Sequence, residues 1–99
     1  THFNTQPLSP LYLADKTNLI DIMEMVSGLF LSKDIVYQNG KPAYLVDLAK
    51  AFEWLFNIRI GDCYQKHEDV IKRKPGKLTG FLNGLVELIK KEHDKKGYR

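Results

Sequence analysis

Cys63 and His67 are a pair of residues whose types and spacing could do chemistry. They lie four apart, so on a helix they would share one face. A thiol beside an imidazole could act as nucleophile and base, or could supply two of the four ligands that zinc needs. The other histidines, His2 and His93, lie near the chain ends, where segments are often mobile. We therefore interpret the pair as a half-buried thiol beside a surface histidine, and we predict no metal site.

Three carboxylates near this pair, Asp62, Glu68 and Asp69, could be combined as a general acid and base. Nothing in the flanking sequence indicates a pocket around them, and a solvated helix face explains them better. The sequence also contains no glycine-rich loop with the spacing of a phosphate-binding motif. We predict that the protein is not an enzyme, and that it has no catalytic residue and no cofactor.

The residues around and after His67 suit a different chemistry, which is contact with double-stranded DNA. Lys and Arg side chains can meet backbone phosphates, and polar side chains on a helix can reach base edges in the major groove. The predicted phosphate contacts are Lys66, Lys72, Arg73, Lys74 and Lys77. The predicted base-edge contacts are Tyr64, Gln65 and His67.

The charge of the chain is distributed unevenly. Residues 1–62 hold five Lys/Arg against seven Asp/Glu, a net charge of −2, whereas residues 63–99 hold ten against five, a net charge of +5. Such asymmetry is typical of a surface that binds an acidic partner. A solvated, lysine-rich end of a small domain explains the charge equally well, so charge alone does not decide.

The periodicity of apolar residues predicts the helices that position these side chains. The first helix begins near Thr17, which suits an N-cap. An extended piece at 35–37 and a turn at 38–41 follow, since Asn-Gly is a strong turn signal. A second helix then runs from about Pro42 to Phe56. The apolar faces of these two helices are formed by Leu19, Ile22, Met23, Val26, Leu29 and Phe30, and by Leu45, Leu48, Ala49, Phe52, Leu55 and Phe56.

The second half of the chain opens with a break between Asn57 and Gly61. A third helix, capped by Asp62, is predicted to run to about Lys72. Pro-Gly in the basic loop 72–77 ends regular helix. A fourth helix begins near Thr79 and frays from residue 90 onward. Its apolar stripe consists of Leu78, Phe81, Leu82, Leu85, Leu88 and Ile89.

A helix, a short turn and a polar second helix are what a helix-turn-helix needs. The predicted fold class is therefore mainly α: a four-helix domain with a helix-turn-helix or winged-helix-like arrangement, its helix pair spanning 42–72. The extended piece 35–37 would be the short first strand, and the loop 72–77 stands where a wing would be.

Ninety-nine residues suit one domain, here a lead-in segment at 1–14 and a helical core at 17–92. The single cysteine excludes an intramolecular disulfide and fits a reducing compartment, so we expect a cytoplasmic location. The sequence contains no apolar run of the ~20 residues that a membrane span needs. Because the chain starts without a methionine, we expect it to be part of a longer protein.

The segment NGKPAYLVDLAKAFEWLFNIRIGDCYQ, residues 39–65, resembles the C-terminal domain of the RteC-like regulatory proteins of Bacteroidetes conjugative transposons. The likeness consists of the turn Asn39-Gly40-Lys41, then Leu48-Ala49, Phe52, Leu55-Phe56-Asn57-Ile58, Gly61-Asp62 and Tyr64, and the basic stretch with Lys72-Arg73-Lys74 and Lys77. The resemblance implies a largely helical, winged-helix-like domain that acts in DNA-linked control of element excision and mobilisation. It also implies a further helical domain that precedes this one.

Two functions remain open from the sequence. The first is the DNA-binding domain of a transcriptional regulator, with promoter DNA as its partner. The second is a protein-interaction or dimerisation module without DNA affinity, whose partner would be a second copy or the preceding helical domain. Its basis is the aromatic cluster at 52–56, including Trp54, and the apolar stripe at 78–89, which together exceed what one small core can bury.

Overall fold

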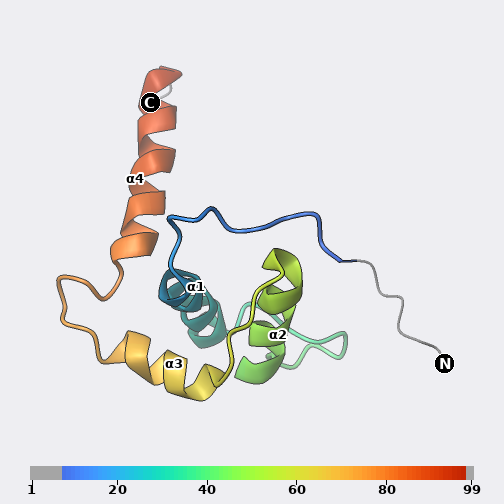
Figure 1. Ribbon diagram of the computed structural model, residues 1–99. Helices are drawn as coiled ribbons and strands as arrows, with labels where there is room; N and C mark the ends of the chain where they lie inside the picture. The colour runs from blue at the N-terminus through green and yellow to red at the C-terminus, as the bar shows by residue number, and fades with distance from the viewer. Residues whose placement is uncertain (1–7, 98–99) are drawn as a thin grey trace.

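Four helices follow one another in the described residues, and Figure 1 shows their arrangement. The structure is a computed structural model that describes residues 8–97. The helices are α1 (Leu19–Ser32), α2 (Leu45–Phe56), α3 (Cys63–Ile71) and α4 (Gly80–Lys95). The prediction of a mainly α, four-helix chain is confirmed. The first helix starts one residue later than expected, because Asn18 and not Thr17 is its N-cap.

The core lies between α1, α2 and α3, which pack against one another in every pairing. α1 contributes Met23 and Val26, both completely buried. They recur at the three-residue spacing that places side chains on one face of a helix. The other buried members are Leu45, Leu48 and Ala49 of α2, Ile60 of the following turn, and Cys63 and Val70 of α3. The predicted apolar faces of the first two helices supply most of this core.

The predicted start of the second helix at Pro42 is wrong. Pro42 instead forms an isolated antiparallel bridge with Val36, and the helix begins after its N-cap Tyr44. The backbone of Ala43 donates to Ile35 at 2.9 Å, and Gly40 closes the predicted turn with a positive φ of 87°. Pro42 and Ala43 are therefore extended, although the backbone geometry of proline is also compatible with the first turn of a helix.

The only β pairing within residues 8–97 is this bridge, so the described chain has no pair of wing strands. The segment between α3 and α4, where a wing was expected, consists of turns. One of them is closed by the Lys77 amide, which donates to the Lys74 carbonyl at 2.8 Å. The winged-helix part of the predicted arrangement is thus not present in this part of the molecule.

α4 leaves the three-helix body and projects from it (Figure 1). None of its residues is buried. The predicted fraying from residue 90 is wrong, because the helix continues to Lys95. Side-chain pairs one turn apart, such as Lys90–Glu87 at 3.9 Å and Lys96–Glu92 at 3.8 Å, support its last turns.

Candidate nucleic-acid interface

The end of α2 is fixed by Asn57, which adopts the left-handed conformation with φ 54°. Asparagine tolerates this region better than most residues. Its side-chain amide donates to the carbonyls of Ser9 and Leu11, at 2.7 and 2.9 Å. The residue that ends the helix therefore also ties the lead-in segment to the fold.

The turn from α2 to α3 is held by one buried side chain and one carboxylate. Ile60 is 2% exposed and belongs to the core. Its backbone amide donates to Glu53 Oε2 at 2.7 Å, which fixes the turn to α2. Gly61 follows with φ 78°, a conformation that disfavours any side chain. Residues 57–62 are a longer connection than the turn of a regular helix-turn-helix.

Asp62 caps α3, as the sequence predicts. Its side chain accepts hydrogen bonds from the backbone amides of Tyr64 and Gln65, both at 3.1 Å. The inner face of the helix is formed by Cys63 and Val70, at 4% and 3% exposed. This face packs against α1 and α2 and directs the opposite side of α3 to solvent.

Tyr64 and Gln65 lie on the outer side of α3, close to its N-terminus, and both are exposed. Glu68 is exposed one turn further on. Gln65 donates to Asp69 Oδ1 at 3.0 Å, and Lys72 Nζ lies 3.7 Å from the same carboxylate. The outer side is therefore polar at its start and mixed in charge toward its end.

His67 faces α1 rather than solvent. Its Nδ1 lies 2.8 Å from the hydroxyl of the buried Ser27, and its ring contacts Phe30 edge-on, with centroids 5.7 Å apart. Lys66, its neighbour, is half-buried. The arrangement of the His67 side chain gives no support to its predicted contact with a base edge.

Cys63 does not pair with His67 either. Burial raises the pKa of the Cys63 thiol above its ordinary value of 9.0. Cys63 is thus a buried thiol, and His67 is hydrogen-bonded to Ser27 of α1. In the part of the chain that the structure describes, no group of three or more His, Cys, Asp or Glu could hold a metal ion.

We expect this thiol to react slowly with a disulfide reagent such as DTNB at pH 8, and at least ~10-fold faster in urea-unfolded chain. Because the folded state holds the proton more tightly, stability should fall as pH rises above about 9, where the unfolded thiol ionises. Stopped-flow labelling and urea titrations at several pH values measure the two effects. Equal labelling rates in the folded and unfolded chain would contradict the buried position.

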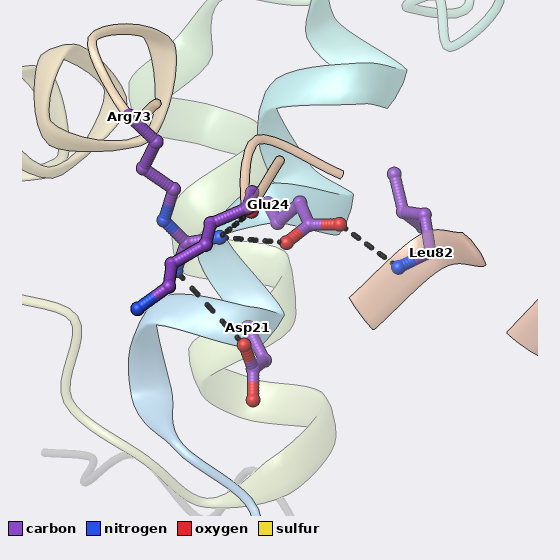
Figure 2. A network of polar contacts seen from close by, with 5 residues as sticks. Asp21, Glu24, Arg73 and Leu82 are labelled. Carbon is purple, nitrogen blue, oxygen red and sulfur yellow. Dashed lines mark hydrogen bonds and ion pairs between the residues drawn. The ribbon is translucent and has the colours of Figure 1, made fainter. Parts of the chain in front are cut away.

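Arg73 is drawn into a network at the junction of α1, the basic loop and α4 (Figure 2). Its Nη1 donates to Glu24 Oε1 at 2.9 Å and to the Lys77 carbonyl at 3.3 Å. Its Nη2 lies 4.0 Å from Asp21. This predicted phosphate contact therefore has two carboxylates of its own chain beside it.

The centre of the network is Glu24, whose side chain is only 2% exposed. Its second oxygen accepts a hydrogen bond from the Leu82 amide in the first turn of α4, at 2.8 Å (Figure 2). A carboxylate is favourable there, because the first amides of a helix lack partners within it. Glu24 and Ser27 are absent from the predicted site residues. Both are buried in α1, although helical spacing places Ser27 beside the predicted apolar stripe and Glu24 on the side away from it.

Lys72, Lys74 and Lys77 are exposed. Lys74 and Lys77 line an open hollow of about 440 Å³ between α1 and the start of α4. Its other lining residues are Asp21, Arg73, Gly76, Gly80 and Phe81. Of the five predicted phosphate contacts, these three lysines stand on one stretch of chain with their side chains toward solvent. Lys66 is half-buried, and helical spacing places it beside the inward-facing Val70.

The chain matches the family model described as "RteC protein" over residues 9–96. It belongs to the RteC protein family. The match covers all four helices and the basic loop between α3 and α4, and it confirms the resemblance seen in the sequence. No curated protein and no solved structure is similar enough to the chain to count as a match.

The RteC family is associated with the regulation of conjugative transposons. This agrees with the regulatory role that the resemblance implies. No helix in the described residues is long and apolar enough to cross a lipid bilayer.

Proposed function

We propose that this RteC domain binds double-stranded DNA in the control of excision and mobilisation of a conjugative transposon. The observation that carries the proposal is the α2–α3 pair, which exposes Tyr64 and Gln65 and continues directly into three exposed lysines. The inner face of α3 is fully used by the core, so its outer side is available to a ligand. The pair takes the role of a helix-turn-helix without a strand-built wing.

The two ends of α3 have different parts in this proposal. In helix-turn-helix proteins the N-terminal residues of the second helix contact base edges. Tyr64 and Gln65 hold that position here. Glu68 and Asp69 would repel DNA phosphates. The middle of α3 is therefore placed at the centre of the major groove, away from the sugar-phosphate backbone. The flanking strand is then contacted by Lys72, Lys74 and Lys77.

Arg73 and His67 do not contact DNA in this proposal. Arg73 supports the loop through Glu24, and His67 supports α3 through Ser27. Their substitution should affect DNA binding through stability, whereas the three lysines should affect it through charge. This difference separates the two groups experimentally.

The test is a salt titration of binding to a fluorescein-labelled DNA duplex of arbitrary sequence, about 30 base pairs long. Replacing Lys72, Lys74 and Lys77 by alanine should lower the slope of log K against log salt by roughly 3, since each phosphate contact contributes about 0.9. The matched control removes the same charge from exposed positions on α4, through Lys90→Ala, Lys91→Ala and Lys95→Ala. If both triple variants lower the slope equally, the loop is not the phosphate-contacting surface.

A second arm addresses base readout. On a promoter fragment of the element, Gln65→Ala should weaken binding about 5- to 100-fold, while binding to the arbitrary duplex stays unchanged. The control is Lys50→Ala, an exposed residue on α2. Equal loss on both DNAs would assign Gln65 to non-specific contact only.

A further inference from the structure

α4 is the least covered helix of the molecule. Within residues 8–97, α1 is the only helix that packs against it, and its first turn is anchored by the Leu82–Glu24 hydrogen bond. Beyond this anchor its apolar side chains become steadily more accessible: Val86 is 45% exposed, Leu88 64% and Ile89 71%. These three residues follow Leu82 in α4, which projects from the three-helix body (Figure 1).

Such a helix is poorly stabilised by itself. α4 has 16 residues, little more than the roughly 12–15 below which an isolated helix is marginal in water, and most helical stability in proteins comes from the packing of an apolar face. Gly80 and Gly84 weaken α4 further. Its apolar face is therefore expected to have a partner.

A groove at the base of α4 offers a matching surface. It has a volume of about 200 Å³ and is almost entirely apolar. Its lining comes from Glu24, Ser27, Gly28, Leu31, Val70, Ile71, Leu78, Thr79 and Leu82. Two of these residues, Leu31 of α1 and Ile71 of α3, are 57% and 44% exposed. Because Leu82 belongs to both, the groove and the apolar face of α4 form one continuous surface.

We propose that a second copy of this chain covers this surface, with the two α4 helices packed antiparallel. Ile89 lies about 10 Å along the helix axis from Leu82, at 1.5 Å per residue. A two-fold axis near Leu85 therefore brings Leu88 and Ile89 of one chain over the groove of the other. The same contact is then made twice, as a closed two-fold dimer requires.

The available area is consistent with a specific dimer. Leu31, Ile71, Val86, Leu88 and Ile89 are the exposed large apolar residues on this surface. At roughly 100 Å² for each side chain, they offer on the order of 500 Å² per chain. A standard interface buries about 800 Å² per partner, including its polar rim. The lysines at 72–77 are not part of this surface, so the dimer does not depend on the proposed DNA contact.

Sedimentation equilibrium of the 99-residue chain tests the proposal. We expect a monomer–dimer equilibrium, and Leu88→Glu with Ile89→Glu should weaken self-association at least ~100-fold. The matched control, Asn83→Glu with Lys91→Gln, makes the same change in charge on the opposite side of α4 and should leave the dimer intact. A wild-type chain that stays monomeric over about a hundredfold range of concentration would overturn the proposal.

Hydrogen exchange gives a second measurement that does not depend on the variants folding well. In the wild-type chain, amides of residues 85–92 should become at least ~10-fold better protected as concentration rises, while core amides of α1 stay constant. Protection of α4 that does not change with concentration would mean that no second copy covers it. If the chain stays monomeric but its DNA binding shows the expected salt slope, the dimer is wrong and the proposed function is supported. If the chain dimerises but the lysine variants do not change the salt slope, the proposed DNA contact is wrong and the dimer is supported.

Discussion

Replacing Glu24 by alanine is expected to lower the free energy of unfolding by about 3–5 kcal/mol. The carboxylate is 2% exposed and holds both the Arg73 guanidinium, at 2.9 Å, and the Leu82 amide, at 2.8 Å. Its removal leaves a largely buried cation and an unpaired helix amide, and each of these costs free energy. Urea denaturation followed by circular dichroism measures the change.

Two further variants make this prediction specific. Glu87→Ala breaks an exposed pair with Lys90 on α4 and should cost less than about 1 kcal/mol. Glu24→Gln keeps an acceptor for the Leu82 amide but removes the negative charge, so its cost should lie between those of the two alanine variants. If Glu24→Ala and Glu87→Ala are equally mild, the buried network does not contribute to stability.

The network also connects parts of the molecule that have different proposed roles. Glu24 belongs to the core helix α1, Arg73 to the basic loop, and Leu82 to the base of α4. A carboxylate that is bonded to both neighbours fixes the direction in which α4 leaves the body. The lysines proposed to contact DNA and the apolar face proposed to pair therefore depend on one buried side chain for their relative placement.

Local features of the fold could be predicted from the sequence because local physics determines them. The buried face of α2 follows the helical period, and Leu45, Leu48 and Ala49 are in the core as expected. Asp62 caps α3 because a carboxylate before a helix can bond its first amides. The Asn-Gly turn forms because glycine accepts a positive φ, here 87° at Gly40.

Contacts between distant residues could not be predicted in this way. Glu24 and Arg73 are separated by 49 residues, and Glu24 and Leu82 by 58. A basic run by itself indicates a phosphate-binding surface, so the sequence predicts Arg73 as a phosphate contact together with its exposed neighbours. The helical period gave no signal for Glu24, because 3.6 residues per turn place it on the side of α1 away from the predicted apolar stripe, where a charged residue is expected to be exposed.

The proposed site was anticipated only in part for the same reason. Tyr64 and Gln65 face outward, as helical geometry around Cys63 and Val70 requires. His67 lies at the edge of the inner face formed by Cys63 and Val70. At such a position, sequence spacing does not predict whether the side chain faces solvent or a neighbouring helix. The hydroxyl of Ser27, 40 positions away in the chain, accounts for its orientation.

Ile60→Ala is the second substitution with a large expected effect, about 2–5 kcal/mol of stability. Ile60 is 2% exposed and brings the connection between α2 and α3 into the core, where little can relax into the space that alanine leaves. Arg59→Ala, at the exposed neighbouring position, should change stability by less than about 0.5 kcal/mol. Both variants can be compared by urea denaturation. If Ile60→Ala is as mild as Arg59→Ala, the turn is not anchored by this side chain, and the placement of α3 relative to α2 must depend on its cap and on the Glu53 hydrogen bond instead.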